Sequence, residues 1–519
     1  DAKKVILTLA DNTTNTITES SRLSTEEDYS AAIYSKEDLI INGNGTLNVN
    51  AGYRNGIKST DDCIIVSGTL NITSTEDGII GKDLCGVVAG DININAGSDG
   101  IKSTYDTDTT KGNVIIEGGN ITIKASNDGI QAENILVIND GTINIKTNNG
   151  AADTTQTHTD NMYMGRGGFG FNNNKTTTTT DDTAESRKGI KAGNMLIIND
   201  GDITIDSDDD SVHCNSEIYI YGGTINAATG DDGVHADDLL TVNGGTINIT
   251  QCYEGIEADD IVINDGDISV VSSDDGINSS DGSITINGGN LLINASGDGL
   301  DANGSIIING GYIVVLGPTS DGDTAIDYDD SCTINGGTVM AFGSSGMLEI
   351  PKGASNGACI VTAFTSVSGG SRYTLSDSNG NEILSYTPSK AYAAAIVYSD
   401  KITTGNTYNI TAGSTTLSIE VTSDVTSNVS SGFGGAGGMN KPGNGGSGMP
   451  NNGSSDNGMN GNYNGSMPDM SGNGAPDMNG NSSGDMPSMG GNSSNNSGNM
   501  PNMNNGSSNG NAPQMNNRM

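Results

Sequence analysis

The sequence predicts an all-β protein built mainly as a single-stranded parallel β-helix, and three observations predict this fold. A phrase close to NGGTINI recurs along the first two thirds of the 519-residue chain, mostly at intervals of 21 to 23 residues. Within each copy, apolar and polar residues alternate over short stretches. Turn pairs such as Asn-Gly, Asp-Gly and Gly-Gly separate these stretches. A fixed period of this length is typical of a solenoid whose repeats stack on one another.

The second glycine of each copy marks the repeat. Three intervals are longer than the rest, with 29, 60 and 26 residues before Gly119, Gly201 and Gly337. The markers predict about twelve coils of roughly 22 residues, each with three short strands and no room for a helix of ordinary length. The twelve markers are Gly45, Gly68, Gly90, Gly119, Gly141, Gly201, Gly223, Gly245, Gly266, Gly289, Gly311 and Gly337.

Alternation within one copy predicts which side chains are buried. Successive strand residues point to opposite faces, so one face collects a set of apolar side chains. In this copy the predicted inward residues are Leu240, Val242, Ile247, Ile249 and Ile256. Because neighbouring coils lie about 4.8 Å apart, residues one repeat apart should be in contact.

Two columns of the repeat illustrate this stacking. Cys63 and Cys85 are 22 residues apart in an inward column, and we interpret them as buried thiols, although a disulfide between them stays open. The chain has no CxxC pair, which disfavours zinc. The column two residues before the marker predicts a structural asparagine ladder of Asn42, Asn139, Asn199, Asn243, Asn264, Asn287, Asn309 and Asn335.

The irregular parts of the chain suggest a domain organisation. We expect an N-terminal cap at 1–28 and the parallel β-helix at 29–342, interrupted by a long insertion at about 148–187. Residues 343–425 lose the period but keep strand patterning, and we expect a small β cap there. Residues 430–519 are rich in Gly, Asn, Ser and Met, and this composition predicts a disordered tail.

Net charge limits the partners and the location. The chain has 22 Lys+Arg against 63 Asp+Glu, a net charge of −41. This charge disfavours nucleic acid and anionic membranes as partners. No run of about 18 apolar residues exists, so we expect no membrane span. The chain begins with Asp1, which suggests a processed, secreted protein, extracellular or at a bacterial cell surface, and we expect a monomer.

Acidic residues concentrate in the later coils. From Ala192 to Pro351 there are 28 Asp and Glu and no Lys or Arg. Stacking brings many of these carboxylates together at Asp-Gly turns, and their repulsion favours hard cations with oxygen ligands, above all Ca²⁺. The alternative is that Asp-Gly is simply a favourable turn with solvated acids. The predicted Ca²⁺ ligands are Asp209, Asp210, Asp231, Asp232, Asp237, Glu254, Glu257, Asp259, Asp274, Asp275, Asp298 and Asp301.

Basic residues occupy the corresponding positions of the earlier coils. A face with a basic end and a calcium-binding end suits an extended polymer that bears carboxylates, because lysines attract uronates and calcium bridges uronate to protein. Alternatively, these lysines only balance the acidic field. The predicted ligand-binding residues are Lys58, Lys102, Lys188, Lys191, His213 and His235.

The motifs DDGVH, EGIEADD and INGGTINI resemble those of secreted clostridial carbohydrate-binding β-helix proteins, which bind cellulose and acidic sugars. The resemblance covers roughly residues 1–425. It implies a right-handed parallel β-helix like those of polysaccharide lyases, bound Ca²⁺, and carbohydrate binding without catalysis.

The coils are also similar to family-nine pectate lyases, in which a DDGxD turn and an Asp of the preceding coil hold the catalytic calcium. This similarity implies Asp231 and Asp232 as the paired acids and Asp209 as the acid of the preceding coil. The last position of the turn is His235 in this chain rather than an Asp.

The lyase base of that family is a Lys in a coil after the calcium, and this chain has none until Lys352. β-Elimination needs a group that removes the proton α to the uronate carboxylate. Only Lys191, one coil before the acidic block, is near, so no catalytic residue is assigned unless Lys191 serves as the base of a lyase.

These observations favour a secreted, non-catalytic, Ca²⁺-binding protein that recognises plant cell-wall polysaccharide. The expected ligands are acidic glycans such as polygalacturonate (pectin), with cellulose as a further possibility. The alternatives are a calcium-dependent pectate or polysaccharide lyase and a cell-surface adhesin with a protein partner.

Overall fold

A computed structural model describes residues 3–20, 30–152 and 186–429 of the chain. These residues form β-strands and connecting turns, without an α-helix. Within this part of the chain, no helix has the length and apolar character needed to cross a membrane. Residues 21–29, residues 153–185 of the predicted insertion and the predicted tail at 430–519 lie outside the described residues.

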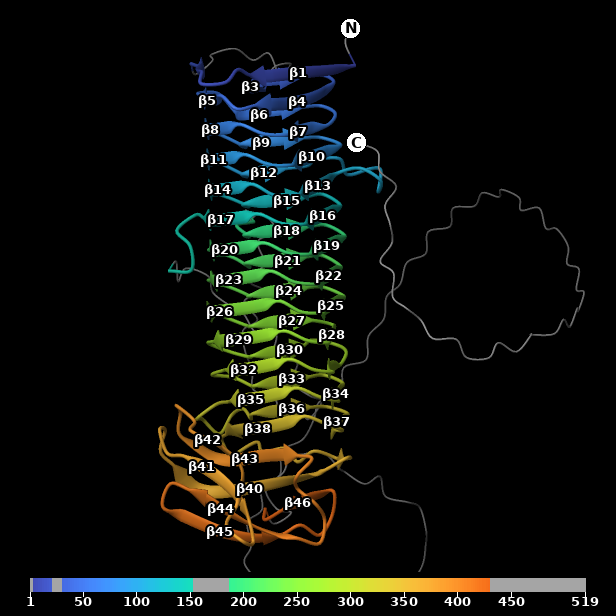
Figure 1. The fold of residues 1–519 in the computed structure, drawn as a ribbon, viewed down its shortest axis with the longest axis vertical. Helices are drawn as coiled ribbons and strands as arrows, with labels where there is room; N and C mark the ends of the chain where they lie inside the picture. The colour runs from blue at the N-terminus through green and yellow to red at the C-terminus, as the bar shows by residue number, and fades with distance from the viewer. Residues whose placement is uncertain (1–2, 21–29, 153–185, 430–519) are drawn as a thin grey trace, which may run out of the picture. The chain divides into compact units, whose positions relative to one another are not determined.

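The main body is the predicted parallel β-solenoid (Figure 1). Each coil contributes one strand to each of three parallel sheets, named A, B and C. Twelve such coils correspond to the twelve marker glycines, and two earlier strands add a partial coil, which makes about 13 turns.

Sheet C has 12 strands. In order they are β3 (Ala31–Ser35), β6 (Asn55–Ser59), β9 (Ile79–Gly81), β12 (Ile101–Lys102), β15 (Ile130–Ala132), β18 (Ile190–Ala192), β21 (Val212–Cys214), β24 (Val234–Ala236), β27 (Ile256–Ala258), β30 (Ile277–Ser279), β33 (Leu300–Ala302) and β36 (Ile326–Tyr328).

Sheet A has 14 strands. In order they are β1 (Lys4–Leu9), β4 (Asp38–Gly43), β7 (Cys63–Ile65), β10 (Leu84–Val87), β13 (Asn113–Ile116), β16 (Ile135–Ile138), β19 (Met195–Ile198), β22 (Glu217–Ile220), β25 (Leu239–Val242), β28 (Asp260–Ile263), β31 (Ile284–Ile286), β34 (Ser305–Ile308), β37 (Ser331–Ile334) and β39 (Gly353–Ala354).

Sheet B has 16 strands. In order they are β2 (Thr14–Glu19), β5 (Thr46–Ala51), β8 (Thr69–Ser74), β11 (Asp91–Ala96), β14 (Asn120–Ala125), β17 (Thr142–Thr147), β20 (Asp202–Ser207), β23 (Thr224–Thr229), β26 (Thr246–Cys252), β29 (Asp267–Ser272), β32 (Asn290–Asn294), β35 (Tyr312–Leu316), β38 (Thr338–Gly343), β43 (Tyr392–Ser399), β40 (Ala358–Val367) and β46 (Val425–Ser427).

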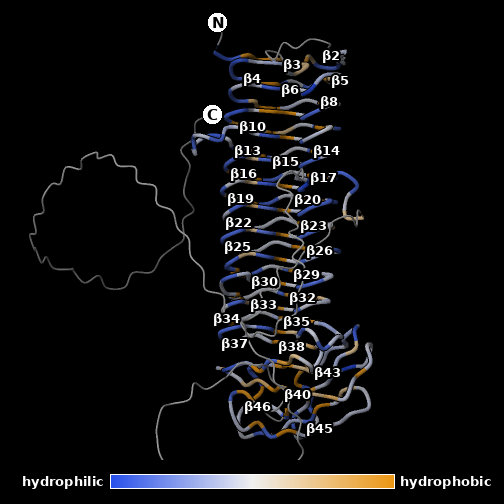
Figure 2. The backbone as a smooth tube through the Cα atoms, turned by 180° about the vertical axis from the view of Figure 1, so that it is seen from behind, coloured by the Kyte–Doolittle hydropathy of each residue, from blue (hydrophilic) through white to orange (hydrophobic). Residues whose placement is uncertain are grey.

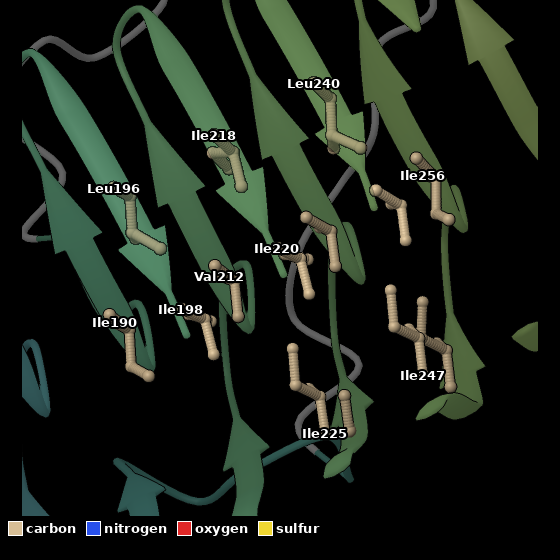
Figure 3. Packing of buried hydrophobic residues seen from close by; sticks show 14 of the residues in the cluster. Ile190, Leu196, Ile198, Val212, Ile218, Ile220, Ile225, Leu240, Ile247 and Ile256 are labelled. Atoms are coloured by element: carbon tan, nitrogen blue, oxygen red, sulfur yellow. The ribbon is translucent and has the colours of Figure 1, made fainter. Parts of the chain in front are cut away.

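The interior of the solenoid is a stack of aliphatic side chains from all three sheets. The predicted inward residues Leu240, Val242, Ile247, Ile249 and Ile256 are each at most 1% exposed, which confirms the prediction from alternation. Figure 3 shows isoleucine, leucine and valine side chains of successive coils meeting between the sheets. Apolar positions therefore recur from coil to coil along the backbone (Figure 2).

Polar ladders and marker glycines hold the corners of the coils. The predicted asparagine ladder is continuous from Asn243 to Asn335, where for example Asn264 donates to Asn243 at 2.9 Å. Asn42 does not belong to it, because the next coil has Val66 at that position. Eleven of the twelve markers have positive φ, between +80° and +128°. A Cβ on Gly245 would lie 2.9 Å from the backbone of the preceding coil. Only glycine fits this corner.

The six cysteines are free and buried. Cys63 and Cys85 are register neighbours on β7 and β10, as their spacing predicted, and they are not joined by a disulfide. Burial raises the pKa of the Cys85 thiol to about 12, so this side chain acts as a small apolar group.

An antiparallel unit covers the C-terminal end of the stack. The last coil strand, β38, pairs with β43 in antiparallel fashion, and β40 and β46 extend the sheet. A separate four-stranded sheet D packs beside it, in the order β42 (Glu382–Tyr386), β41 (Tyr373–Asp377), β44 (Thr407–Ala412) and β45 (Thr415–Glu420). Phe342 and Met340 of the last coil are buried in the core of this unit, which removes an open sheet edge.

We predict that Ile247→Ala lowers the free energy of unfolding by about 2–5 kcal/mol, because it leaves a cavity in a close-packed stack. The neighbouring Thr246→Ala, on the outward face of the same strand, is the matched control and should change stability by less than about 0.5 kcal/mol. Urea unfolding followed by circular dichroism measures both. Equal effects of the two variants would contradict the assignment of the two faces.

Candidate functional site

The outward side chains of sheet C form one continuous file along the solenoid. Backbone register places each member beside the corresponding residue of the next coil. The file changes from basic to acidic along the chain. Its members, here named the sheet C file, are Tyr34, Lys58, Ile80, Lys102, Gln131, Lys191, His213, His235, Glu257, Asn278, Asp301 and Asp327.

A second file occupies the turn that leads from sheet B into sheet C. Most of its side chains accept hydrogen bonds from backbone N–H groups of the next coil, whereas the Lys188 ammonium donates to Asp210 of the next coil. For example, the N–H of Asp232 donates to Asp210 at 3.1 Å, and the N–H of Glu254 donates to Asp232 at 3.2 Å. The members, here named the turn file, are Asn55, Asp77, Asp99, Asp128, Lys188, Asp210, Asp232, Glu254, Asp275 and Asp298.

The turn file therefore has a structural role that the sequence did not reveal. A carboxylate at this turn satisfies a backbone donor that would otherwise lack a partner. The bond from the Asp298 N–H to Asp275 is 2.6 Å long, and the Thr324 N–H donates to Asp298 in the same way. Backbone capping explains why acids recur there, but it requires only one oxygen of each carboxylate and not the charge.

At its N-terminal end, the predicted acidic block is neutralised by basic residues of the preceding coil. The Lys188 ammonium contacts Asp209 at 2.9 Å and Asp210 at 2.5 Å, and Arg187 contacts Asp208 at 2.8 Å. Burial opposes ionisation of Asp210, yet the Lys188 charge holds the pKa of that carboxyl well below its usual range. Lys188 is thus engaged in an internal ion pair rather than presented to a ligand.

Two histidines extend this neutralised region by one coil. His213 bonds to Asp210 through Nδ1 at 2.8 Å and to Asn215 through Nε2 at 2.9 Å. Its ring centroid lies 4.9 Å from that of His235. Burial opposes the charge of His235, but hydrogen bonds to Asp210 and Asp232 raise its pKa to about 11.

Three carboxylates near the C-terminal end form a cluster without such compensation. One oxygen from each of Asp275, Asp298 and Asp301 lies within 4.8 Å of the others. Burial, with the Asp274 carboxylate, raises the pKa of Asp275 to about 8. Burial raises the pKa of Asp298 to about 9, and burial with Asp327 raises that of Asp301 to about 7. Among the described residues, no ion pair reaches these three side chains.

The remaining predicted metal ligands lie between these two ends or outside the clusters. Asp231 joins Asp209 and Asp210 within 4.8 Å, and Glu257 joins Asp232 and His235. Burial, followed by the Glu257 charge, raises the pKa of Glu254 to about 9. Asp237, Asp259 and Asp274 belong to none of the described clusters: Asp237 is 3.6 Å from His235, and Asp259 accepts a hydrogen bond from Ser280.

The lysines of the sheet C file differ in their availability. Lys102 forms a 2.6 Å ion pair with Asp99. The Lys191 ammonium donates to Ser186 Oγ at 3.2 Å, and Lys58 has no ion pair among the described residues. Lys58 and Lys191 are therefore the two lysines of this file with charge left for a ligand.

Sequence reasoning missed one cluster of acids and one further acid of the sheet C file. Asp38, Asp61 and Asp62 form a further cluster within 4.8 Å at the N-terminal coils. The register that pairs Leu39 with Cys63 also brings Asp38 beside Asp62, so the repeat arithmetic could have found it. Asp327 follows Asp301 in the sheet C file, and the 26-residue interval before Gly337 concealed this pairing.

Comparison with known proteins places this architecture in a family. The chain matches a family model described as "carbohydrate-binding domain-containing protein" over residues 1–233 and 231–350. The chain belongs to this carbohydrate-binding domain-containing protein family. A carbohydrate-binding domain-containing protein of Acetivibrio thermocellus is 37% identical to it over 75 residues, which are 14% of this chain. The match spans 26% of that relative's length. No solved structure matches the chain.

We predict that Lys188→Met lowers the free energy of unfolding of this carbohydrate-binding domain protein by about 3–5 kcal/mol, because it leaves buried carboxylates unpaired. The folded-state pKa of Asp210 lies below its usual 3.8. The pair therefore stabilises the fold above that pH, and this contribution is lost as the pH falls further. The stability gap between variant and native protein should be widest near neutral pH and should close in acid.

Chemical unfolding at several pH values measures this gap. Lys58→Met, which removes a lysine without a described ion pair, is the control and should be near neutral in effect. Adding Asp210→Asn to Lys188→Met should recover part of the loss. A Lys188→Met protein as stable as the native one would contradict the neutralisation of this end of the block.

Proposed function

We propose that this protein is a secreted, non-catalytic, Ca²⁺-dependent binder of acidic plant cell-wall polysaccharide such as polygalacturonate. Family membership supports carbohydrate binding, and the sheet C file suggests the class of carbohydrate. The observation that carries the proposal is the cluster of Asp275, Asp298 and Asp301, whose negative charge no described cation balances.

This cluster has the donors that calcium prefers. Ca²⁺ accepts six to eight oxygen ligands in flexible geometry. Asp275 and Asp298 each use one oxygen for a backbone N–H, and the other oxygen of each carboxylate can face an ion. Asp301 belongs to the adjacent sheet C file and adds a carboxylate from a second direction. A bound cation would convert mutual repulsion of the three acids into shared attraction.

The same face can hold a uronate polymer along its length. Asp275, Asp298 and Asp301 would hold a Ca²⁺ ion that could also bind a uronate carboxylate, while Lys58 and Lys191 offer positive charge further along the file. Coils repeat about every 4.8 Å, which is close to the rise of one sugar in an extended glycan. Successive sugars can therefore meet successive coils.

The geometry favours binding over the lyase alternative. Lys191 lies four coils before Asn278, the sheet C file residue of the coil that contains Asp275. Four coil spacings are about 19 Å, too far for one uronate to contact both a calcium at the cluster and this lysine. Lys191 lies close enough to Asp128 of the preceding coil to oppose the rise in the pKa of that carboxyl, and Asp209 and Asp210 of the next coil are already neutralised by Lys188.

We predict that Ca²⁺ raises the melting temperature of the protein. At a Ca²⁺ concentration 100 times the Kd, the free energy of unfolding should increase by about 2.7 kcal/mol. Asp298→Asn/Asp301→Asn should abolish this gain. The asparagines keep acceptors for backbone N–H groups, so in chelator the variant should be at least as stable as the native protein. Asp281→Asn, at an exposed acid outside the cluster, should keep the gain. Calorimetry with Ca²⁺, Mg²⁺ or chelator measures these melting temperatures. A native protein whose melting temperature does not change with Ca²⁺ would exclude the calcium site.

We predict that the protein is retained on insoluble polygalacturonate with Ca²⁺ and released by chelator. Lys58→Ala/Lys191→Ala should weaken retention, and added salt should weaken it further because these charges are partly exposed. The fraction retained is measured by co-sedimentation. Retention that ignores both chelator and the lysine variants would contradict the proposed mode, and unsaturated uronate product would favour the lyase.

A further inference from the structure

A cleft of about 340 Å³ lies between the last coils of the solenoid and the C-terminal unit. Small-molecule sites usually have volumes of about 300 to 1,000 Å³. Its floor is the outward face of sheet B, and one wall is strand β42, which lies beside the last coils (Figure 1). The cleft does not belong to the repeat, because the wall comes from sheet D.

The floor is a row of three residues in register across three strands. Tyr312 of β35 is paired with Thr338 of β38, which is paired with Ser399 of β43. Tyr312 is 45% exposed, although most large apolar side chains of this region are buried. A partly exposed aromatic side chain therefore stands beside two hydroxyl groups.

The wall and rim supply fixed polar groups. Arg372 and Ser385 orient Glu382: the guanidinium donates to both carboxylate oxygens, at 2.9 and 3.1 Å, and the hydroxyl donates at 2.7 Å. The Ser399 hydroxyl donates to Asp400 at 3.2 Å. Ile383 and Leu384 of β42 add apolar surface between these groups.

We propose that this cleft binds a pyranose ring of a neutral glycan, at a site separate from the calcium face. The apolar face of a sugar ring would stack on Tyr312, and its hydroxyls would donate to the carboxylates of Glu382 and Asp400. The amphipathic character of the cleft, one aromatic face surrounded by acceptors and donors, matches a sugar ring in both respects. The ligand class rests on the proposed carbohydrate-binding function, whereas the site and its neutral ligand are independent of calcium.

The charges around the cleft balance one another. Glu382 and Asp400 are both negative, and the Arg372 charge is already shared with Glu382. Lys401 alone among the lining residues adds a positive charge. These charges therefore offer a uronate carboxylate no net attraction, while the hydroxyls of a neutral sugar meet acceptors.

The cleft and the Asp275–Asp298–Asp301 cluster lie at opposite ends of the sheet B strands. Tyr312 is the first residue of β35, whereas Asp298 follows the last residue of β32, at the turn into sheet C. Loss of one site should thus leave the other intact, which allows the two proposals to be tested separately in the full chain.

The test is titration calorimetry of the full chain with cellohexaose in the presence of chelator. Native protein should bind, and Tyr312→Ala should weaken binding roughly tenfold, equivalent to about 1.4 kcal/mol. Tyr312→Phe keeps the aromatic face and should bind nearly as well as the native protein. Tyr221→Ala removes another exposed tyrosine, 48% accessible, and should have no effect.

A second arm separates this proposal from the calcium face. Tyr312→Ala should retain Ca²⁺-dependent binding to polygalacturonate, and Asp298→Asn/Asp301→Asn should retain cellohexaose binding. Absence of cellohexaose binding by a native protein that holds polygalacturonate would overturn the cleft proposal alone. Binding of cellohexaose that Tyr312→Ala leaves unchanged would overturn it as well, by placing the neutral sugar elsewhere.

Discussion

The coil spacing is the constraint on which the rest of the structure depends. Equivalent residues of successive coils stand about 4.8 Å apart, so each side chain lies against the residues at the same position of the neighbouring coils. Apolar columns gain from this contact, as the buried Ile and Leu stacks show. Amide columns gain too, because each asparagine can donate to the previous one and accept from the next. Carboxylate columns lose, since like charges at this distance repel.

The repulsion among the acids of the turn file is reduced in different ways at different coils. Near the middle of the solenoid, Lys188 occupies a position of the turn file itself, so that its ammonium lies against the acids of the next coil. Two coils later His235 carries positive charge among Asp210, Asp232 and Glu257. Beyond that point the described chain brings no cation to the file, and the carboxyls respond by higher pKa values. A site for an external cation is therefore expected where internal cations end.

Periodicity determined which parts of this arrangement could be read from the sequence. Alternation identified Leu240 and Ile247 as interior residues, and the repeat length brought Asp210 beside Asp232, as their hydrogen bond shows. The same arithmetic failed where the interval changes. Lys188 follows Asp128 in the turn file after 60 residues, so its place in the acidic column was concealed. Capping of backbone N–H groups by carboxylates also has no sequence signal distinct from an ordinary Asp-Gly turn. The cleft at Tyr312 depends on antiparallel pairing of Thr338 with Ser399, and no period predicts that pairing.

A repeating file and a single cleft have different consequences for a polymer. A shift of a glycan by one coil along the sheet C file would bring each sugar opposite a similar position. The file alone therefore sets the direction of the bound glycan but not its position along the solenoid. Positions one coil apart are not fully equivalent, because a uronate meets a different charge at each coil. The file passes, for example, from Lys191 through His213 and His235 to Asp301. The cleft occurs once and has a wall from outside the repeat, so a sugar ring held there would have one position only. A chain with both kinds of surface could hold an acidic polymer by many weak contacts and a neutral one at a fixed point. Because the two surfaces lie at opposite ends of the sheet B strands, neither polymer would need to displace the other.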